Sequence, residues 1–151
     1  FTIASHNAVS TKNGRRYMSL GSGDEVLAVF PCAGDEHIAL ATHKGRALLF
    51  HVSEIPPKSS AVRGVNAIKL ESGDRVLGFS LTQKKRQGLT AWTSRGRELV
   101  VRETSYRPTK RGGKGAVVLK VGSLIKCDWP AQILQPQKEE DIVEIEEDGD
   151  E

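Results

Sequence analysis

The residues of this chain that are best suited to chemistry are cations set among glycines. Residues 110–115 read Lys-Arg-Gly-Gly-Lys-Gly, which places three cations within six positions. Glycine lets the backbone approach another chain closely, and exposed N–H groups in such a segment can bind phosphate. The alternative interpretation is a solvated, flexible loop. Because further cations lie in the same connection, we expect contact with the phosphates of a nucleic acid backbone.

Other kinds of site find little support in the sequence. The histidines and the two cysteines show no recognised zinc spacing, and we find neither a nucleophile–base pairing nor a phosphate-binding P-loop. Asp24 and Asp74 each follow a glycine and are interpreted as turn residues, because Asp can bond its own backbone. The run Lys84-Lys85-Arg86 favours a solvated loop over a DNA contact. We therefore expect no catalytic residue, no metal and no cofactor in this segment.

A unit of about 50 residues occurs twice and must position these cations. Segment 22–30 returns at 72–79 with an offset of 50, segment 43–50 at 94–101 with an offset of 51, and segment 62–64 at 110–112 with an offset of 48. Three landmarks therefore recur in one order. A repeat of this length rich in β-branched residues is typical of propeller blades or a related array.

The repeat places cations at equivalent positions. Equivalent positions of an array fall on equivalent surfaces, so these cations are expected to form a stripe around one edge. The candidate DNA-binding residues are Lys58, Arg63, Arg107, Lys110, Arg111, Lys114, Arg15 and Arg16.

The elements that carry the repeat are expected to be short strands. Runs rich in Val, Ile, Leu, Phe and Thr and bounded by Gly, Asp, Ser or Pro predict strands at 25–30, 37–42, 47–52, 67–70, 75–81, 89–93, 98–102, 116–121 and 124–129. The polar connections 53–64 and 103–115 contain prolines, which argue against helix. An apolar fraction of 38% predicts a thin core between small sheets.

Charge is distributed unevenly along the chain. Residues 138–151 carry a charge of −8 and residues 1–137 a charge of +11, for a net charge of +3. We expect 1–137 to form the folded domain, with repeat units at 1–21 (partial), 22–71 and 72–134, and 138–151 to be a disordered acidic tail. The tail is either a solubilising end or a mimic of nucleic acid that occupies the basic edge. No apolar run is long enough to span a bilayer, and the opening at Phe1 predicts a fragment of a longer polypeptide.

Residues 65–76 and 45–56 carry a resemblance to a known family. They resemble the C-terminal domain of the A subunit of bacterial type IIA DNA topoisomerases, meaning the A subunit of DNA gyrase and that of topoisomerase IV, and the similarity covers nearly all of residues 1–134. The resemblance implies a β-pinwheel, a propeller-like ring or spiral of four-stranded antiparallel blades that exchange strands. Complete family domains have about five or six blades, so this chain is expected to be a partial ring of about three.

Residues 109–115 also resemble the gyrase signature heptapeptide Gln-Arg-Arg-Gly-Gly-Lys-Gly at five of seven positions. Thr109 replaces the Gln and Lys110 replaces an Arg. In gyrases the motif belongs to the first blade, whereas here it precedes the acidic tail. These departures leave open the handedness of DNA wrapping and the choice between the gyrase and topoisomerase IV branches.

The resemblance implies a module that binds and bends or wraps double-stranded DNA, in the bacterial cytoplasm at the nucleoid. The holoenzyme would perform ATP-dependent strand passage with Mg²⁺, as an A2B2 assembly of the remainder of the A subunit with an ATPase B subunit. This segment itself is expected to be non-catalytic. The alternative is a non-enzymatic β-repeat scaffold that binds a protein partner, which predicts an apolar, aromatic-rich patch on its outer face.

Overall fold

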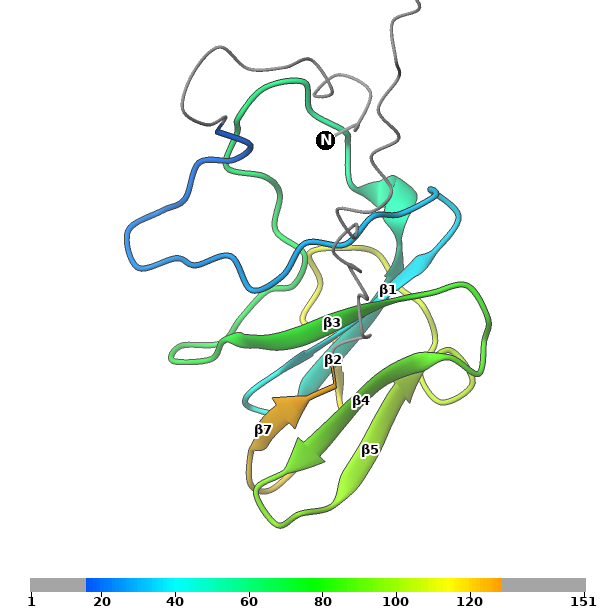
Figure 1. Ribbon diagram of the computed structural model, residues 1–151. Helices are drawn as coiled ribbons and strands as arrows, with labels where there is room; N and C mark the ends of the chain where they lie inside the picture. The colour runs from blue at the N-terminus through cyan, green and yellow to red at the C-terminus, as the bar shows by residue number, and fades with distance from the viewer. Residues whose placement is uncertain (1–15, 129–151) are drawn as a thin grey trace, which may run out of the picture.

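Short antiparallel strands make up the computed structural model, which describes residues 16–128 (Figure 1). The strands are β1 (His37–Thr42), β2 (Arg46–His51), β3 (Val76–Thr82), β4 (Gly88–Thr93), β5 (Glu98–Arg102), β6 (Ala116–Val117) and β7 (Leu124–Cys127). A 3-10 helix, η2 (Val52–Glu54), follows β2. In this part of the chain no helix has both the length and the apolar character needed to cross a membrane. The predicted all-β class is confirmed.

One of the two sheets combines strands from both repeat units. One sheet has the order β3-β1-β2-β6 and the other has the order β5-β4-β7, and every pairing within them is antiparallel. The first hairpin, β1–β2, thus receives β3 and β6 from the second repeat unit. Strand β7 joins the second hairpin, β4–β5, in the way that β3 joins the first. The first repeat unit therefore does not complete its sheet alone.

Two predicted strands, 25–30 and 67–70, are wrong, because both segments lack β-structure. Shifted by the repeat offsets they correspond to β3 and β6, the strands that the second unit gives to the first hairpin. A matching hairpin for them would precede residue 25, and residues 16–24 contain none. The predicted strand 116–121 is likewise limited to β6. Strand-forming sequence therefore does not become a strand where its partner hairpin is not among the described residues.

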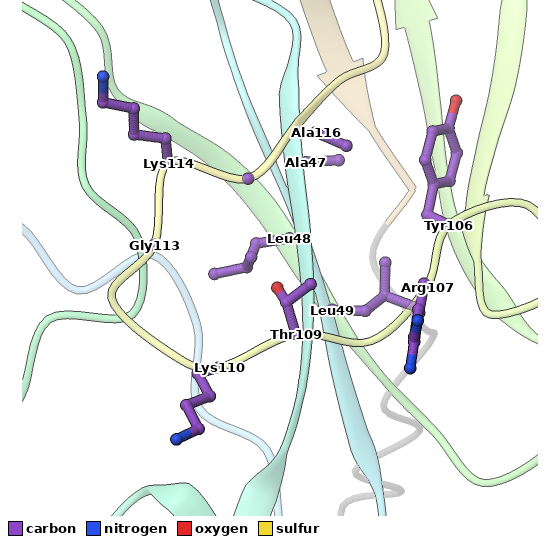
Figure 2. Close-up of a pocket in the computed structure, with 11 residues that line it drawn as sticks. Ala47, Leu48, Leu49, Tyr106, Arg107, Thr109, Lys110, Gly113, Lys114 and Ala116 are labelled. Atoms are coloured by element: carbon purple, nitrogen blue, oxygen red, sulfur yellow. The ribbon is translucent and has the colours of Figure 1, made fainter.

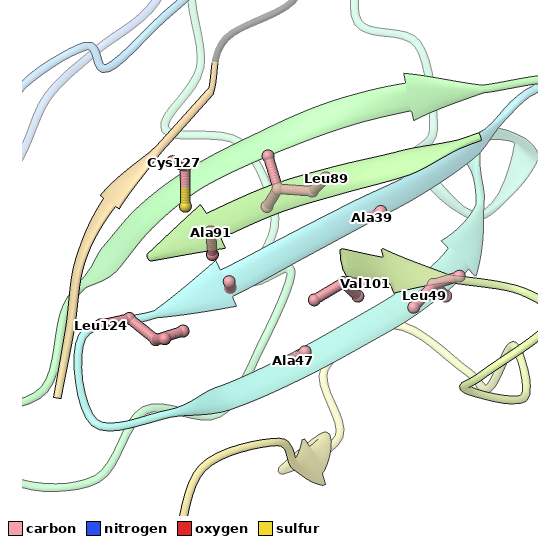
Figure 3. Packing of buried hydrophobic residues seen from close by; sticks show 9 residues of the cluster. Ala39, Ala47, Leu49, Leu89, Ala91, Val101, Leu124 and Cys127 are labelled. Atoms are coloured by element: carbon pink, nitrogen blue, oxygen red, sulfur yellow. The ribbon is translucent and has the colours of Figure 1, made fainter. Parts of the chain in front are cut away.

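The core between the sheets is built from small side chains (Figure 3). It comprises Ala39, Ala41, Ala47, Leu49, Leu89, Ala91, Val101, Leu124 and Cys127, all nearly inaccessible to solvent. A second cluster, around Phe50, lies on the other face of the first sheet. Because four of the nine residues in the first cluster are alanines, the two sheets approach closely over a thin core, as the composition predicts. Burial raises the pKa of the Cys127 thiol to about 11, so it stays protonated at neutral pH.

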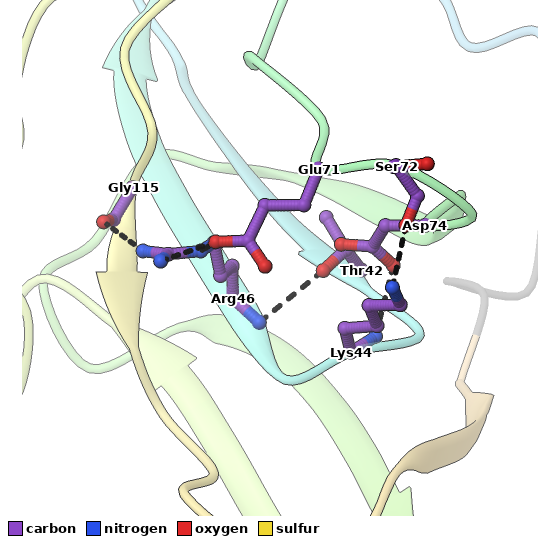
Figure 4. Close-up of polar contacts among 7 residues, drawn as sticks. All are labelled: Thr42, Lys44, Arg46, Glu71, Ser72, Asp74 and Gly115. Atoms are coloured by element: carbon purple, nitrogen blue, oxygen red, sulfur yellow. Dashed lines mark hydrogen bonds and ion pairs between the residues drawn. The ribbon is translucent and has the colours of Figure 1, made fainter.

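Asp74 closes a turn and ties it to the β1–β2 hairpin (Figure 4). Its Oδ1 accepts the backbone N–H of Lys44 at 2.9 Å and that of Arg75 at 2.8 Å. Arg46 reaches the same turn through an ion pair with Glu71 at 2.6 Å. The interpretation of Asp74 as a turn residue is confirmed. Lys44 and Arg46 both bind to the turn that Asp74 closes.

The Asp74 carboxylate is expected to make the stability of the folded domain depend on pH in the acidic range. Burial acts to raise its pKa, but hydrogen bonds from the Lys44 N–H, the Thr42 hydroxyl and the Arg75 N–H, with the charge of Lys44, together hold the pKa below its ordinary value. A carboxyl with a lowered pKa stabilises the folded state above its unfolded pKa, about 4, and that contribution is lost as the pH falls through the folded pKa. Asp74→Asn should therefore lower the free energy of unfolding at pH 7 by about 1 kcal/mol, and the difference should narrow below about pH 4. Urea denaturation across pH measures it; a difference independent of pH would contradict it.

Candidate nucleic-acid interface

The basic connection, residues 103–115, is fastened to the first repeat unit at several points. The backbone N–H of Thr109 donates to the carbonyl of Leu49 in β2 at 2.8 Å. Beyond it, Gly112 donates to the carbonyl of Ala67 at 2.7 Å, and the carbonyl of Gly113 accepts from Lys69 at 2.9 Å. Backbone bonds of this kind fix the path of a segment, so the basic connection has a defined position along β2 and the connection before it.

Three cations surround a hollow between this connection and β2 (Figure 2). The hollow has a volume of about 500 Å³, and its lining includes Arg107, Lys110 and Lys114. All three are exposed, and none makes a side-chain hydrogen bond or ion pair within residues 16–128. Figure 2 shows the two lysine side chains extending away from the middle of the loop in different directions. Cations spread around a rim suit the successive phosphates of an extended polyanion better than one small anion.

Arg111 is placed differently from its neighbours. Its side chain is half-buried, with Nε donating to the carbonyl of Glu54 at 3.1 Å and Nη1 donating to the carbonyl of Asn66 at 2.5 Å. Its backbone N–H donates to the Glu54 carboxylate at 2.8 Å. The guanidinium of Arg111 therefore joins the basic connection to the first repeat unit.

The other candidates lie away from this hollow. Lys58 and Arg63 belong to the preceding connection, and both are exposed. Arg63 approaches Asp24 at 3.9 Å, an exposed pairing of little energetic weight. Arg16 is exposed, and Arg15 and the acidic tail lie outside the described residues. The structure thus brings together Arg107, Lys110, Arg111 and Lys114, while the continuous stripe stays a prediction.

Sequence reasoning missed the residues that hold the basic connection in place. Glu54 is 57 positions from Arg111, and no local pattern marks it as a partner. Leu48, Tyr106 and Thr109 line the hollow, and nothing in their types or spacing marked them as site residues. Only the repeat offset offered a signal, because it predicts that residues 110–112 return to a surface next to the preceding unit.

Gly115→Ala is expected to loosen the basic connection. Gly115 has φ +71°, and an added Cβ would clash with the carbonyl oxygen of Ala47 in β2. The left-handed conformation costs an alanine about 1–2 kcal/mol before any clash. Gly112→Ala is the matched control, since φ is +80° there and the nearest atom to an added Cβ is 3.8 Å away. Thermal unfolding should show a larger loss for the Gly115 variant; equal losses would mean that close packing on β2 is unimportant.

Comparison with known proteins places this architecture in a family. A model of the DNA gyrase C-terminal domain, a beta-propeller, matches residues 8–33, 36–83 and 93–121. These stretches contain the strands β2 and β5, the hairpin turns and the basic connection. The chain belongs to the DNA gyrase C-terminal domain family.

Comparison with individual relatives leads to the same family. The A subunit of DNA gyrase from Aminobacterium colombiense is 34% identical over 122 residues, which is 78% of this chain and 15% of the relative. The A subunit of DNA gyrase from Dehalogenimonas lykanthroporepellens is 32% identical over 120 residues, again 15% of its length. The chain thus spans about a seventh of the curated relatives that it matches. The suspected family is confirmed.

Solved structures support the fold of the gyrase-family domain. A C-terminal domain of DNA topoisomerase IV superposes with a TM-score of 0.63 and 24% identity, covering 72% of this chain and 36% of that one. A DNA gyrase A C-terminal domain superposes with a TM-score of 0.59 and 22% identity, covering 78% and 42%. At these identities the likeness establishes the fold alone.

Proposed function

We propose that this chain is the duplex-DNA-binding and bending module of the A subunit of a type IIA DNA topoisomerase. The observation that carries the proposal is the ring of exposed cations, Arg107, Lys110 and Lys114, on a basic connection that is fastened to β2. Such cations neutralise phosphates and release counterions, which gives affinity without reading base sequence. Membership of the gyrase C-terminal domain family supports the choice of duplex DNA as the polyanion.

The DNA would bend if its phosphates stayed in contact with the cations of successive repeat units. Duplex DNA is stiff, and bending a site of 20–30 base pairs costs on the order of 1–6 kcal/mol, which added contacts must repay. Lys58, Arg63, Arg15 and Arg16 would extend the contact surface to earlier repeats. DNA that follows this surface would be presented to a catalytic core outside this chain.

The remaining parts of the proposal concern the whole enzyme. The A subunit would act with an ATPase B subunit in an A2B2 assembly, using ATP and Mg²⁺ for strand passage in the bacterial cytoplasm. Supercoiling, relaxation and decatenation are all compatible with such a module. This segment would contribute binding and bending, and it would supply no catalytic group.

Fluorescence anisotropy of a labelled 40-base-pair duplex across a salt series tests the proposal, comparing residues 1–151 with 1–137. We expect binding that is independent of sequence and weakens steeply with salt, since log K falls by about 0.9 per neutralised phosphate for each decade of salt. If the acidic tail competes for the basic edge, 1–137 should bind more tightly. Absence of binding by both chains at low salt would reject the proposal and favour a scaffold that binds a protein partner.

A further inference from the structure

The glycines of the basic connection raise the conformational entropy that this segment loses when it takes up one conformation. Residues 112, 113 and 115 are all glycine, and Gly112 and Gly115 have positive φ values of +80° and +71°. Glycine loses more backbone freedom on ordering than any other residue. A segment of this composition keeps one conformation only where other groups fix it.

Anchored positions flank each of the two lysines in this segment. Lys110 lies between Thr109, whose N–H donates to Leu49, and Arg111. Lys114 lies between Gly113, whose carbonyl accepts from Lys69, and Gly115, which packs against β2. The lysine side chains themselves make no hydrogen bond or ion pair within the described part of the chain. The connection therefore fixes the backbone and leaves the two ammonium groups available.

Arg111 supplies the anchor between the two lysines. Its guanidinium spans the carbonyls of Glu54, at the start of the preceding connection, and Asn66, just beyond the end of that connection. The Glu54 carboxylate accepts the Arg111 backbone N–H, which adds a third bond between the basic connection and the first repeat unit. An arginine with two of its five N–H donors engaged by carbonyls has fewer donors left for a phosphate.

We propose that Arg111 is a positioning residue, which latches the basic connection to Glu54 and Asn66 so that Lys110 and Lys114 meet phosphate. This inference rests on the proposed function, because it assigns roles within the same DNA surface. Within residues 16–128, the equivalent residue one repeat earlier, Arg63, makes no such pair of bonds: its side chain is 75% exposed and approaches Asp24 at 3.9 Å. In the described part of the chain, the two arginines therefore have different surroundings despite their equivalent places in the repeat.

The test measures duplex affinity and its salt dependence for Arg111→Gln, Arg111→Lys, Lys110→Gln and Lys114→Gln. Each lysine variant should reduce the slope of log K against log salt by about 0.9, as expected for one lost phosphate contact. Both Arg111 variants should lose affinity by about tenfold with the slope unchanged, because lysine keeps the charge but cannot span two carbonyls. Hydrogen exchange without DNA should show faster exchange at Thr109 and Gly112 in both.

Glu54→Ala gives an independent outcome, since it removes the carboxylate that accepts the Arg111 backbone N–H while keeping every cation. We expect it to weaken DNA binding although it makes the chain more positive. Tighter binding by Glu54→Ala, or wild-type affinity for Arg111→Lys with a slope lowered by about 0.9 for Arg111→Gln, would overturn the latch and make Arg111 a phosphate contact. Failure of the unmodified chain to bind duplex at any salt would instead reject the proposed function.

Discussion

Replacing Arg107, Lys110 and Lys114 together by glutamine is expected to lower the affinity for duplex DNA about 500-fold at 0.1 M salt. With log K falling by about 0.9 per phosphate contact for each decade of salt, one contact is worth about eightfold between 1 M and 0.1 M salt. Three independent contacts multiply to the stated loss, and the slope should fall by about 2.7. All three side chains are exposed at the rim of one hollow, so their removal should leave the fold intact. Anisotropy titrations with circular dichroism as a check on folding measure the effect.

The matched control removes the same charge elsewhere. Lys84, Lys85 and Arg86 are exposed in the β3–β4 loop, and Lys85 approaches Glu103 at 3.6 Å. Their triple glutamine variant changes the net charge equally but touches no residue of the hollow. We expect an affinity loss of less than about tenfold, from the long-range field alone. Equal losses in the two triple variants would show that binding depends on net charge and that the basic connection is not the contact surface.

Leu89→Ala is expected to lower the free energy of unfolding by about 3 kcal/mol, within the range measured for buried leucines. Leu89 lies on β4, is fully inaccessible to solvent, and packs in the core shared by the two sheets. Its neighbours include four alanines, whose methyl side chains are too short to fill the cavity. The cavity should therefore stay largely open, and a domain with a stability of about 5–15 kcal/mol loses a large share of it. Urea denaturation monitored by tryptophan fluorescence measures the loss.

Val117→Ala on β6 is the control for this core substitution. Val117 is 52% exposed at the edge of the first sheet, so its truncation should cost less than about 1 kcal/mol. Comparable losses at Leu89 and Val117 would mean that the two sheets are stabilised mainly by strand pairing. A loss at Leu89 below about 1 kcal/mol would mean that the core collapses onto the missing side chain.

The strands that form a hairpin within one repeat unit could be predicted from the sequence. Segments 37–42 and 98–102 match β1 and β5, while the prediction for β4 differs by one residue at its start and that for β2 by one residue at each end. Their signal is local, because a turn with a glycine at positive φ, such as Gly45 or Gly96, lies between two runs of β-forming residues. The three rim cations could also be predicted from a local signal, because composition alone marks their segment as basic and flexible.

The sequence by itself determined the all-β repeat, the turns at Asp24 and Asp74, and the positions of the cations along the basic connection. Tertiary structure alone decided which strand-like runs become strands and which cations stay free. Segments 25–30 and 67–70 have the right composition but lack a hairpin to pair with among the described residues. Arg111 resembles Lys110 and Lys114 in type but finds the carbonyls of Glu54 and Asn66. In both cases the deciding partner lies far away in sequence, and hydrogen bonds between distant segments leave no periodic trace in the residues that make them.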